Sequence, residues 1–358
     1  MLNDLEKRTQ AQTDPNLPEN LVGPSPKMAI ILALETSCDE TAAAVFWGEQ
    51  LLSSEVTSQI DIHAPYGGVV PEVASREHIR ALRPIIDLAL KKADIAIGAI
   101  DAVAATCGPG LASSLMIGTS IAKGLSVALG RPFLAINHLE GHLLSPFFGT
   151  ADGVSPAVGL IVSGGHTLLI EVEALGKYTL LGQTQDDAAG EAFDKVGKLL
   201  GLPYPGGPHL DRLARGGDPT LYDFPRSMIG SPDFHFSFSG LKTAVRYLLP
   251  KLQPAQLPDV CASFQEAVVD VLISKTVRAA QARGLNLITV SGGVSCNTRL
   301  REKLLATCAA QGLRVLLVPP QLCTDNAAMI GYVAALRWST GATSALTVDI
   351  DPNLRLAT

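Results

Sequence analysis

Short apolar runs, each bounded by polar or glycine-bearing turns, recur along the chain. The first run covers 30–34, and a second run at 42–47 follows the polar turn 35–41. The same order of run, turn and run returns within 157–172. A short apolar run between turn residues is typical of a buried strand. This approximate internal repeat therefore predicts two similar lobes, each built on its own sheet.

Longer segments between the apolar runs have the spacing of helices. Residues 264–283 place Phe264, Val268 and Val271 on one face, which predicts a helix packed on the core. Further helices are predicted at 113–129, at 298–311 and at 72–92, the last one interrupted or started near Pro84. Strands that alternate with helices indicate an α/β protein.

The domain organisation follows from these elements. The segment 1–27 is polar and rich in proline, so it is predicted to be a disordered extension. The remaining boundaries are 28–148 for the first lobe, 149–324 for the second lobe, about 325–340 for a helix that packs back on the first lobe, and 341–358 for a C-terminal tail.

Composition narrows the class of protein. The chain has 358 residues, is 47% hydrophobic, and carries a net charge of -6, so no overall positive field attracts nucleic acid. Any RNA contact therefore needs a local patch or a partner protein. The 6 cysteines form no C-x-x-C pair, as expected of reduced cytosolic thiols. The sequence shows no signal peptide and no apolar run that we expect to span a bilayer, which predicts a cytoplasmic protein without a membrane partner.

Two histidines four residues apart are the strongest candidate for chemistry. His138 and His142 follow the apolar run 133–136, and on a helix positions i and i+4 share a face. Two imidazoles and one carboxylate form a common open site for zinc or iron(II), and we expect Asp325 to supply the carboxylate. The alternative is that both histidines lie on a helix surface or cap a helix. Glu140 is two residues after His138, so a helix turns it away from the metal-binding face, which weakens a metalloprotease reading.

Small residues and carboxylates mark candidate contacts for a substrate. The turn Ser163-Gly164-Gly165 ends a buried strand, where bare backbone amides can approach a phosphate. Asp187, Glu191 and Asp194 have the spacing of one helix face, which is either a solvated acidic turn or a set of acceptors for ligand hydroxyls and amines.

Two further features carry weaker predictions. The amide of Gly207 together with the carboxylate of Asp211 would suit a ribose or an amino group. Arg76, Arg80 and Arg83 share one helix face, which is usually solvated surface and is here the first candidate for RNA phosphates.

Ten segments of the chain, in order, resemble one known family, the bacterial and organellar tRNA N6-adenosine threonylcarbamoyltransferases, formerly described as O-sialoglycoprotein endopeptidases. The matching segments span nearly all of the chain after Met28, and they read ALETSCDET (33–41), YGGVVPEVASREH (66–78), GPGL (108–111), HLEGHLL (138–144), LIVSGGHT (160–167), DDAAGEAFDKVGKLLGLPYPGGP (186–208), FSFSGLKT (236–243), FQEAVVDVL (264–272), SGGVSCN (291–297) and CTDNAAMI (323–330).

This resemblance implies a two-lobed fold of the actin, Hsp70 and sugar-kinase ATPase superfamily. It implies transfer of a threonylcarbamoyl group from threonylcarbamoyl-AMP to N6 of adenosine 37 in tRNAs that read codons beginning with A. His138, His142 and Asp325 match the metal ligands of the family, with Fe(2+) expected first and Zn(2+) as the alternative. The positions that match the family's substrate contacts are Ile161, Val162, Ser163, Gly164, Gly165, Asp194, Gly207, Asp211 and Asn297.

The resemblance also implies partners: tRNA, an inactive paralogue of the same fold and a P-loop ATPase. No catalytic base is evident, although Asp39 and Glu40 in the first turn are candidates. Three rival functions are an ATP-dependent small-molecule kinase of the same fold, a metalloprotease, and a scaffold without activity. The kinase hypothesis predicts no tightly held His-bound metal, and the scaffold hypothesis predicts that the metal ligands are missing.

Overall fold

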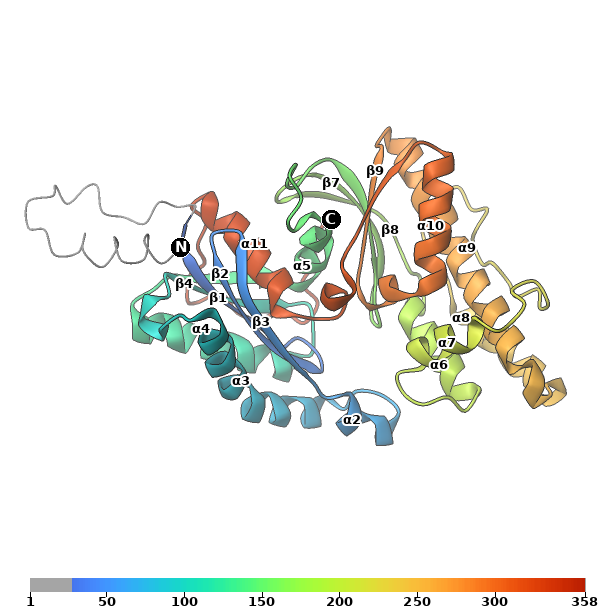
Figure 1. The fold of residues 1–358 in the computed structure, drawn as a ribbon, viewed down its shortest axis with the longest axis horizontal. Helices are drawn as coiled ribbons and strands as arrows, with labels where there is room; N and C mark the ends of the chain where they lie inside the picture. Colours follow the sequence, from blue (N-terminus) through green and yellow to red (C-terminus); the bar gives the residue numbers. More distant parts are fainter. Residues whose placement is uncertain (1–27, 358) are drawn as a thin grey trace, which may run out of the picture.

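Two five-stranded sheets of the same design organise the chain in a computed structural model that describes residues 28–357 (Figure 1). The predicted extension 1–27 lies outside the described residues. The first sheet has the order β3-β2-β1-β4-β5 and the second has the order β10-β9-β6-β7-β8. The elements of the two sheets are β1 (Ile30–Glu35), β2 (Glu40–Trp47), β3 (Gln50–Ser58), β4 (Ala102–Gly108) and β5 (Phe133–Asn137), followed by β6 (Ala157–Val162), β7 (Thr167–Ala174), β8 (Lys177–Gln183), β9 (Leu287–Ser291) and β10 (Arg314–Leu317).

The predicted repeat of the sequence is a repeat of sheet topology. In each sheet three antiparallel strands are joined by two parallel strands: β1 pairs with β2 antiparallel and with β4 parallel, and β6 pairs with β7 and β9 in the same way. The strands β1, β4, β6 and β9 are buried on both faces, which explains their continuous apolar runs. The prediction of two similar α/β lobes is confirmed at the level of the fold.

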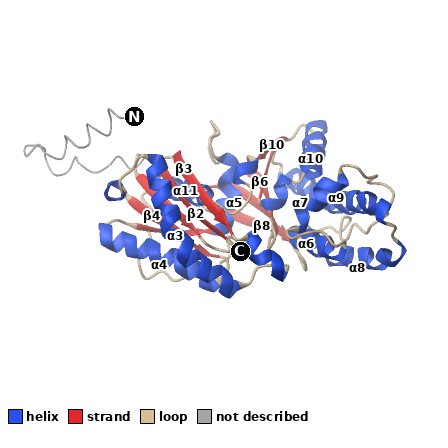
Figure 2. Ribbon diagram, turned by 60° about the horizontal axis from the view of Figure 1, so that its bottom comes forward, coloured by secondary structure: helices blue, strands red, loops and turns tan. Residues whose placement is uncertain are grey.

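Helices cover both faces of the first sheet (Figure 2). The long helices α3 (Pro71–Ala93) and α4 (Ala112–Leu129) pack on one face, and α11 (Ala327–Ser339) packs against β1 and β2 on the other. The short helix α2 (Ile60–His63) precedes α3. The predicted interruption at Pro84 is wrong, because α3 runs through this exposed proline. Leu82, Ile85 and Ile86 pack into the core on either side of it, and this packing offsets the lost backbone hydrogen bond.

The second lobe contains the largest apolar core, which surrounds the helix α9 (Leu257–Arg283). The other helices of this lobe are α6 (Ala189–Leu199), α7 (Gly206–Ala214), α8 (Ser239–Leu248) and α10 (Thr298–Ala310), and the helix α5 (His138–Leu144) follows β5 between the two sheets. Short 3₁₀ turns lie at Ala64–Tyr66, Ile97–Ala99, Ser145–Phe147, Leu249–Lys251, Pro254–Gln256, Gly293–Cys296 and Pro320–Leu322.

The C-terminal segment 341–357 returns to the first lobe. Ser344 forms a bridge with Phe133, and the Asp351 amide donates to the Cys107 carbonyl. Further along, the Gly110 amide donates to the Pro352 carbonyl. This segment therefore supports the turn after β4, which borders the cavity described below.

One helix of the described segment, α4, is long and apolar enough to cross a membrane by length and composition. Our sequence prediction saw no such run. In the fold α4 packs against β4 and α3, so its composition also suits a helix that covers a sheet.

Candidate metal centre and substrate cavity

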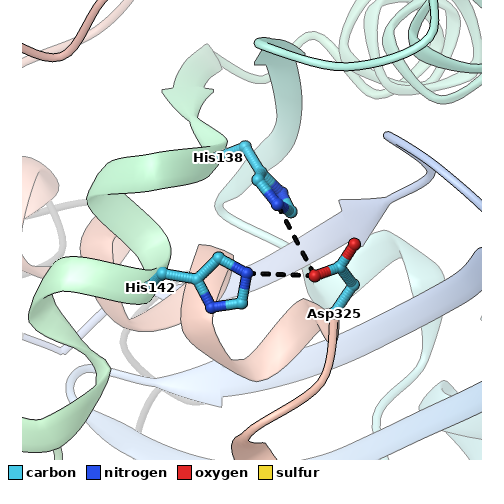
Figure 3. A group of neighbouring side chains, drawn as sticks. All are labelled: His138, His142 and Asp325. Atoms are coloured by element: carbon cyan, nitrogen blue, oxygen red, sulfur yellow. Dashed lines mark hydrogen bonds and ion pairs between the residues drawn. The ribbon is translucent and has the colours of Figure 1, made fainter. Parts of the chain in front are cut away.

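The two histidines reach a common point because α5 begins where β5 ends. The side chain of Asn137 caps α5, since its Oδ1 accepts hydrogen bonds from the Leu139 amide at 2.8 Å and the Glu140 amide at 3.3 Å. Both histidines therefore lie in the first turns of the helix and point the same way (Figure 3). The predicted sharing of one helix face is confirmed.

Asp325 completes the group from a distant part of the chain. It directly precedes Asn326, the residue that caps α11. Its Oδ1 lies 3.0 Å from His142 Nε2 and 3.5 Å from His138 Nε2 (Figure 3). One ligand atom from each of the three residues lies within 4.8 Å of the others. Two imidazole nitrogens and a carboxylate oxygen so placed fit a divalent transition-metal ion.

Glu35, at the end of β1, holds the ring of His138. Its Oε2 lies 3.1 Å from His138 Nδ1, and Ser37 Oγ lies 3.1 Å from the same nitrogen. The Glu35 carboxylate is fully buried and also accepts hydrogen bonds from the Ser37 amide and the Thr106 hydroxyl. With Nδ1 donating to Glu35, Nε2 is the ring nitrogen that faces Asp325. Histidine ligands of metals are commonly oriented by such a carboxylate.

Sequence reasoning missed Glu35. The available signal was its position as the single acidic residue at the carboxyl end of a buried apolar run, 30–35. That end of a sheet is where α/β proteins place ligand groups.

The charges of this group are strongly coupled. Burial lowers the pKa of His138, but Asp325 and Glu35 more than offset burial and raise that pKa to about 9. Burial raises the pKa of Asp325, and the two histidines outweigh it and hold the pKa well below the usual range. At neutral pH, therefore, a His138 cation lies between two carboxylates. A metal ion would displace that proton and take its place electrostatically.

His142 is oriented differently from His138. Its Nδ1 is buried and has no hydrogen-bond partner within residues 28–357. The ring meets the His138 ring edge to face, with the centroids 4.7 Å apart. Packing and Asp325 therefore fix this ring, whereas a second carboxylate fixes His138.

Glu140 takes no part in the site. Its fully buried carboxylate accepts a hydrogen bond from Tyr178 Oη at 2.8 Å and pairs with Arg337 at 2.6 Å. It thus ties α5 to β8 and α11. The predicted orientation of Glu140 away from the histidines is confirmed, and the general base that a metalloprotease needs is absent from this helix position.

A cavity of about 1220 Å³ opens beside the metal-ligand group and is lined by both lobes. The first lobe contributes the turn Ser37–Glu40 and the segment 109–111. Most of the predicted substrate contacts line the cavity, namely Ser163, Gly164, Gly165, Asp194, Gly207, Asp211 and Asn297. The side chains of Ile161 and Val162 instead point into the two apolar cores, so only their backbone is available to a ligand.

The turn after β6 exposes bare backbone, as predicted. At Gly164 and Gly165 an added Cβ atom would meet nothing within 4 Å. Gly164 and Gly165 are exposed and line the cavity, so a phosphate could reach their amides without steric hindrance. The predicted contribution of the Ser163 amide is wrong, because this amide donates to the His166 carbonyl at 2.8 Å.

Three polar residues on the second-lobe wall of the cavity already form hydrogen bonds that hold or cap the helices α6, α7 and α10. Asp194 Oδ1 accepts hydrogen bonds from the amides of Gly206 at 2.8 Å and Gly207 at 3.3 Å. Asp211 accepts from the Thr298 hydroxyl at 2.9 Å. Asn297 caps α10 through the Leu300 amide, 2.9 Å from its Oδ1. Burial raises the pKa of Asp194, although the two amides partly offset it.

The prediction that Asp187 shares a helix face with Glu191 and Asp194 is wrong. Asp187 precedes α6, which begins at Ala189. Lys195 bridges Asp187 at 2.6 Å and Glu191 at 2.9 Å, whereas Asp194 turns toward α7. The backbone enters α6 only after Asp187, whose carbonyl accepts a hydrogen bond from the Thr184 hydroxyl in the preceding turn.

The first turn carries the two candidate bases. Burial, reinforced by Asp325 and Asp39, raises the pKa of Glu40 to about 10. Glu40 is therefore protonated at neutral pH and cannot accept a proton in the cation-free protein. His166 also lines the cavity, and burial together with the two neighbouring histidines lowers its pKa to about 4, so this imidazole is neutral.

A buried histidine fixes the backbone of this turn. His78 on α3 has Nε2 at 2.9 Å from the Cys38 carbonyl oxygen and Nδ1 at 2.7 Å from the Thr41 hydroxyl. Gln59 lies 3.4 Å from the same Nδ1 and 3.1 Å from His63 Nε2. Burial lowers the pKa of His78, so the ring is neutral and holds the Cys38 carbonyl as a donor. This chain of contacts gives a structural role to His78, the last residue of the segment 66–78.

The fold alone assigns the chain to a class of proteins. A solved HypF from T. kodakarensis superposes with a TM-score of 0.60 and 14% sequence identity, covering 88% of this chain and 48% of that one. Component A of the (R)-2-hydroxyglutaryl-CoA dehydratase of Acidaminococcus fermentans gives a TM-score of 0.54 and 14% identity, covering 87% of this chain and 99% of that one. The protein therefore has the two-lobed actin-like ATPase fold, as predicted.

Sequence comparison identifies the family within this class. A sequence model of the family tRNA N6-adenosine threonylcarbamoyltransferase matches residues 50–332. A curated member from Geobacter metallireducens is 50% identical over 335 residues, which is 92% of this chain and 98% of the relative. A member from Syntrophotalea carbinolica is 49% identical over 331 residues, covering 91% of this chain and 95% of the relative. The chain belongs to the tRNA N6-adenosine threonylcarbamoyltransferase family and is a transferase that modifies tRNA.

Proposed function

We propose that this transferase moves the threonylcarbamoyl group of threonylcarbamoyl-AMP onto N6 of adenosine 37 in tRNAs that read codons beginning with A. One observation supports this assignment above the others. A single cavity brings the His138 and Asp325 ligand atoms together with the exposed amides of Gly164 and Gly165. An acyl adenylate has both a carbonyl end and a phosphate end, and the cavity offers a matching group for each.

We propose that His138, His142 and Asp325 hold one divalent cation, Fe(2+) in the first place and Zn(2+) in the second. When bound, such an ion polarises a carbonyl oxygen and stabilises the negative charge that develops on it. Glu35 keeps His138 in the tautomer with a free Nε2, which is the form that ligates a cation.

The protein's own groups then position the substrate. The mixed anhydride of the adenylate is already activated, so orientation and charge stabilisation are the main requirements. We assign the phosphate to the amides of Gly164 and Gly165, with the backbone of Ile161, Val162 and Ser163 beneath them, because the Ser163 amide itself donates to the His166 carbonyl at 2.8 Å. The remaining polar contacts to the adenylate are assigned to Asp194, Gly207, Asp211 and Asn297.

The acceptor amine must lose a proton during transfer. Of the two carboxylates in the first turn, Glu40 is protonated, which leaves Asp39 as our candidate acceptor for that proton. Asp39→Asn should reduce transfer while leaving bound metal unchanged. A variant that retained full activity would eliminate Asp39 as the base.

Cellular context follows from the resemblance of the sequence. We propose that the chain works in the cytoplasm with an inactive paralogue of the same fold and a P-loop ATPase. The support is the match of whole bacterial relatives, which this chain covers to 98% in the first case. Co-purification from cells with a tagged chain tests both partners.

Mass spectrometry of tRNA nucleosides tests the function. The purified chain is incubated with tRNA, threonylcarbamoyl-AMP and its partners, and metal content is measured in parallel. His142→Ala should lose both bound metal and the modified nucleoside. His235→Ala, at a histidine outside the cavity, is the matched control and should lose neither. Activity of the His142 variant without metal would refute the metal's role, and ATP-dependent phosphorylation of a metabolite would favour the kinase alternative.

A further inference from the structure

In the part of the chain that the structure describes, three cations at the second-lobe side of the cavity have no acidic partner. They are Lys198 on α6, Arg212 on α7 and Lys242 on α8, and all three line the cavity. None of them takes part in an ion pair within residues 28–357. The two other cations of this wall are paired, Lys195 with Asp187 and Glu191, and Arg215 with Asp211. We call Lys198, Arg212 and Lys242 the basic rim.

The unpaired cations and most of the carboxylates of the cavity lie at different depths; the partly exposed Glu191 is neutralised by Lys195. Lys198 and Arg212 are exposed and Lys242 is half-buried. Asp211 and Asp39 are buried, and the Asp325 side chain is only 21% exposed. In a chain of net charge -6, an unneutralised row of cations at the mouth of a cavity creates a local positive potential. Such a potential attracts an anion to the entrance rather than to the floor.

The basic rim is long enough to contact more than one phosphate group. The helix α6 adjoins both α7 and α8 at the end of the second lobe that faces α2 (Figure 1). Arg246 lies one turn after Lys242 on α8, is exposed, and continues the row away from the cavity. On the opposite side, Lys198 Nζ would lie 3.2 Å from a Cβ atom at Gly67, so the row also borders the first lobe.

We propose that the basic rim, extended by Arg246, binds consecutive backbone phosphates of the tRNA strand that carries the acceptor adenosine. This inference rests on the tRNA-modifying function. Threonylcarbamoyl-AMP has a single phosphate, for which the open amides of Gly164 and Gly165 already provide a site. Cations distributed over three helices suit a polyanion instead, because each phosphate contact adds separately to affinity.

The arginine row predicted from the sequence is a weaker candidate for this surface. Arg76, Arg80 and Arg83 are exposed on α3 but do not line the cavity. Arg80 lies 3.4 Å from Glu77, and Arg83 lies 3.8 Å from Asp87, so two of the three charges are partly neutralised.

Binding of tRNA to two matched triple variants tests the proposal. K198A/R212A/K242A and R76A/R80A/R83A each remove three positive charges from exposed or half-exposed positions. The dissociation constant of the purified chain for labelled tRNA is measured without adenylate over a series of salt concentrations. We expect the rim variant to weaken binding about tenfold or more and to reduce the slope of log K against log salt by about 2. We expect the α3 variant to stay within about twofold of the parent protein.

Several outcomes would overturn the proposal. An unchanged rim variant, or an equal or larger loss in the α3 variant, would place the tRNA elsewhere. A weaker affinity for AMP, with tRNA binding intact, would assign the rim to the adenylate phosphate. Arg246→Ala gives a second measurement, since it leaves the cavity wall intact and should reduce the salt slope by about 1. Because no transfer is measured, failure of the proposed chemistry leaves this test readable.

Discussion

Replacing Glu35 by glutamine would test how the metal-binding tautomer of His138 is selected. In Glu35→Gln the amide oxygen keeps the Ser37 amide, and the new NH₂ group faces His138 Nδ1, where the carboxylate Oε2 lies now. A donor at that position requires Nδ1 to accept, so the ring proton moves to Nε2. The nitrogen that points at Asp325 then keeps its proton even in the neutral ring, so it has no lone pair for a metal cation.

The size of the effect follows from the burial of the contact. Glu35 is fully buried, and the Nδ1 to Oε2 distance is 3.1 Å, so water cannot replace the lost acceptor. Removing such an orienting partner typically weakens metal binding about 10- to 100-fold, which corresponds to about 1.4–2.7 kcal/mol. Chelator competition with the purified chain measures this affinity directly.

Glu140→Gln is the matched control. Glu140 is also fully buried and lies on the metal-ligand helix itself, but its partners are Tyr178 and Arg337. We expect this variant to lower stability and to keep its metal affinity. Unchanged metal affinity in Glu35→Gln, or an equal loss in both variants, would refute the tautomer argument.

Three other perturbations have defined outcomes. Gly108→Ala places a Cβ atom 1.9 Å from the Asp351 carbonyl oxygen at a φ of +151°, and should lower the free energy of unfolding in urea by about 2 kcal/mol or more. Gly130→Ala, with open space at a φ of +62°, should lower it by only about 1 kcal/mol. Equal losses in the two variants would contradict the clash. Arg299 and Lys303 lower the pKa of Glu266 to about 2 against the opposing effect of burial. The ion pairs of Glu266 therefore stabilise the fold above the pKa that this carboxyl has in the unfolded chain, and the stabilisation is lost as pH falls toward 2. Because the Arg299 side chain is 38% exposed, we expect this stabilisation to be only about 2 kcal/mol. The stability of Glu266→Gln should therefore depend less steeply on acid pH, and an unaltered profile would show that the pair contributes nothing. His78→Leu frees the carbonyl of the first turn and should lower kcat about tenfold with bound metal unchanged; a loss of metal instead would mean that the turn supports the ligands rather than the substrate.

Local sequence determined a large part of this protein. The apolar runs 30–34 and 157–162 predict the central strands of both sheets, because a buried strand needs only its own side chains and the turns beside it. The spacing of His138 and His142 predicts a shared direction, because the geometry of one helical turn fixes it. The open space beside Gly164 and Gly165 is local for the same reason.

Tertiary structure decided which of these groups meet. His138 contacts Glu35 across 103 positions of sequence, and His142 contacts Asp325 across 183, and no periodicity carries information over such separations. The same limit applies to charge. Sequence spacing predicted a row of cations at Arg76, Arg80 and Arg83. The basic rim, in contrast, comes from three helices and forms a row only after those helices pack. Whether a cation is neutralised depends on which carboxylates the fold places beside it, and that is a property of the packed chain.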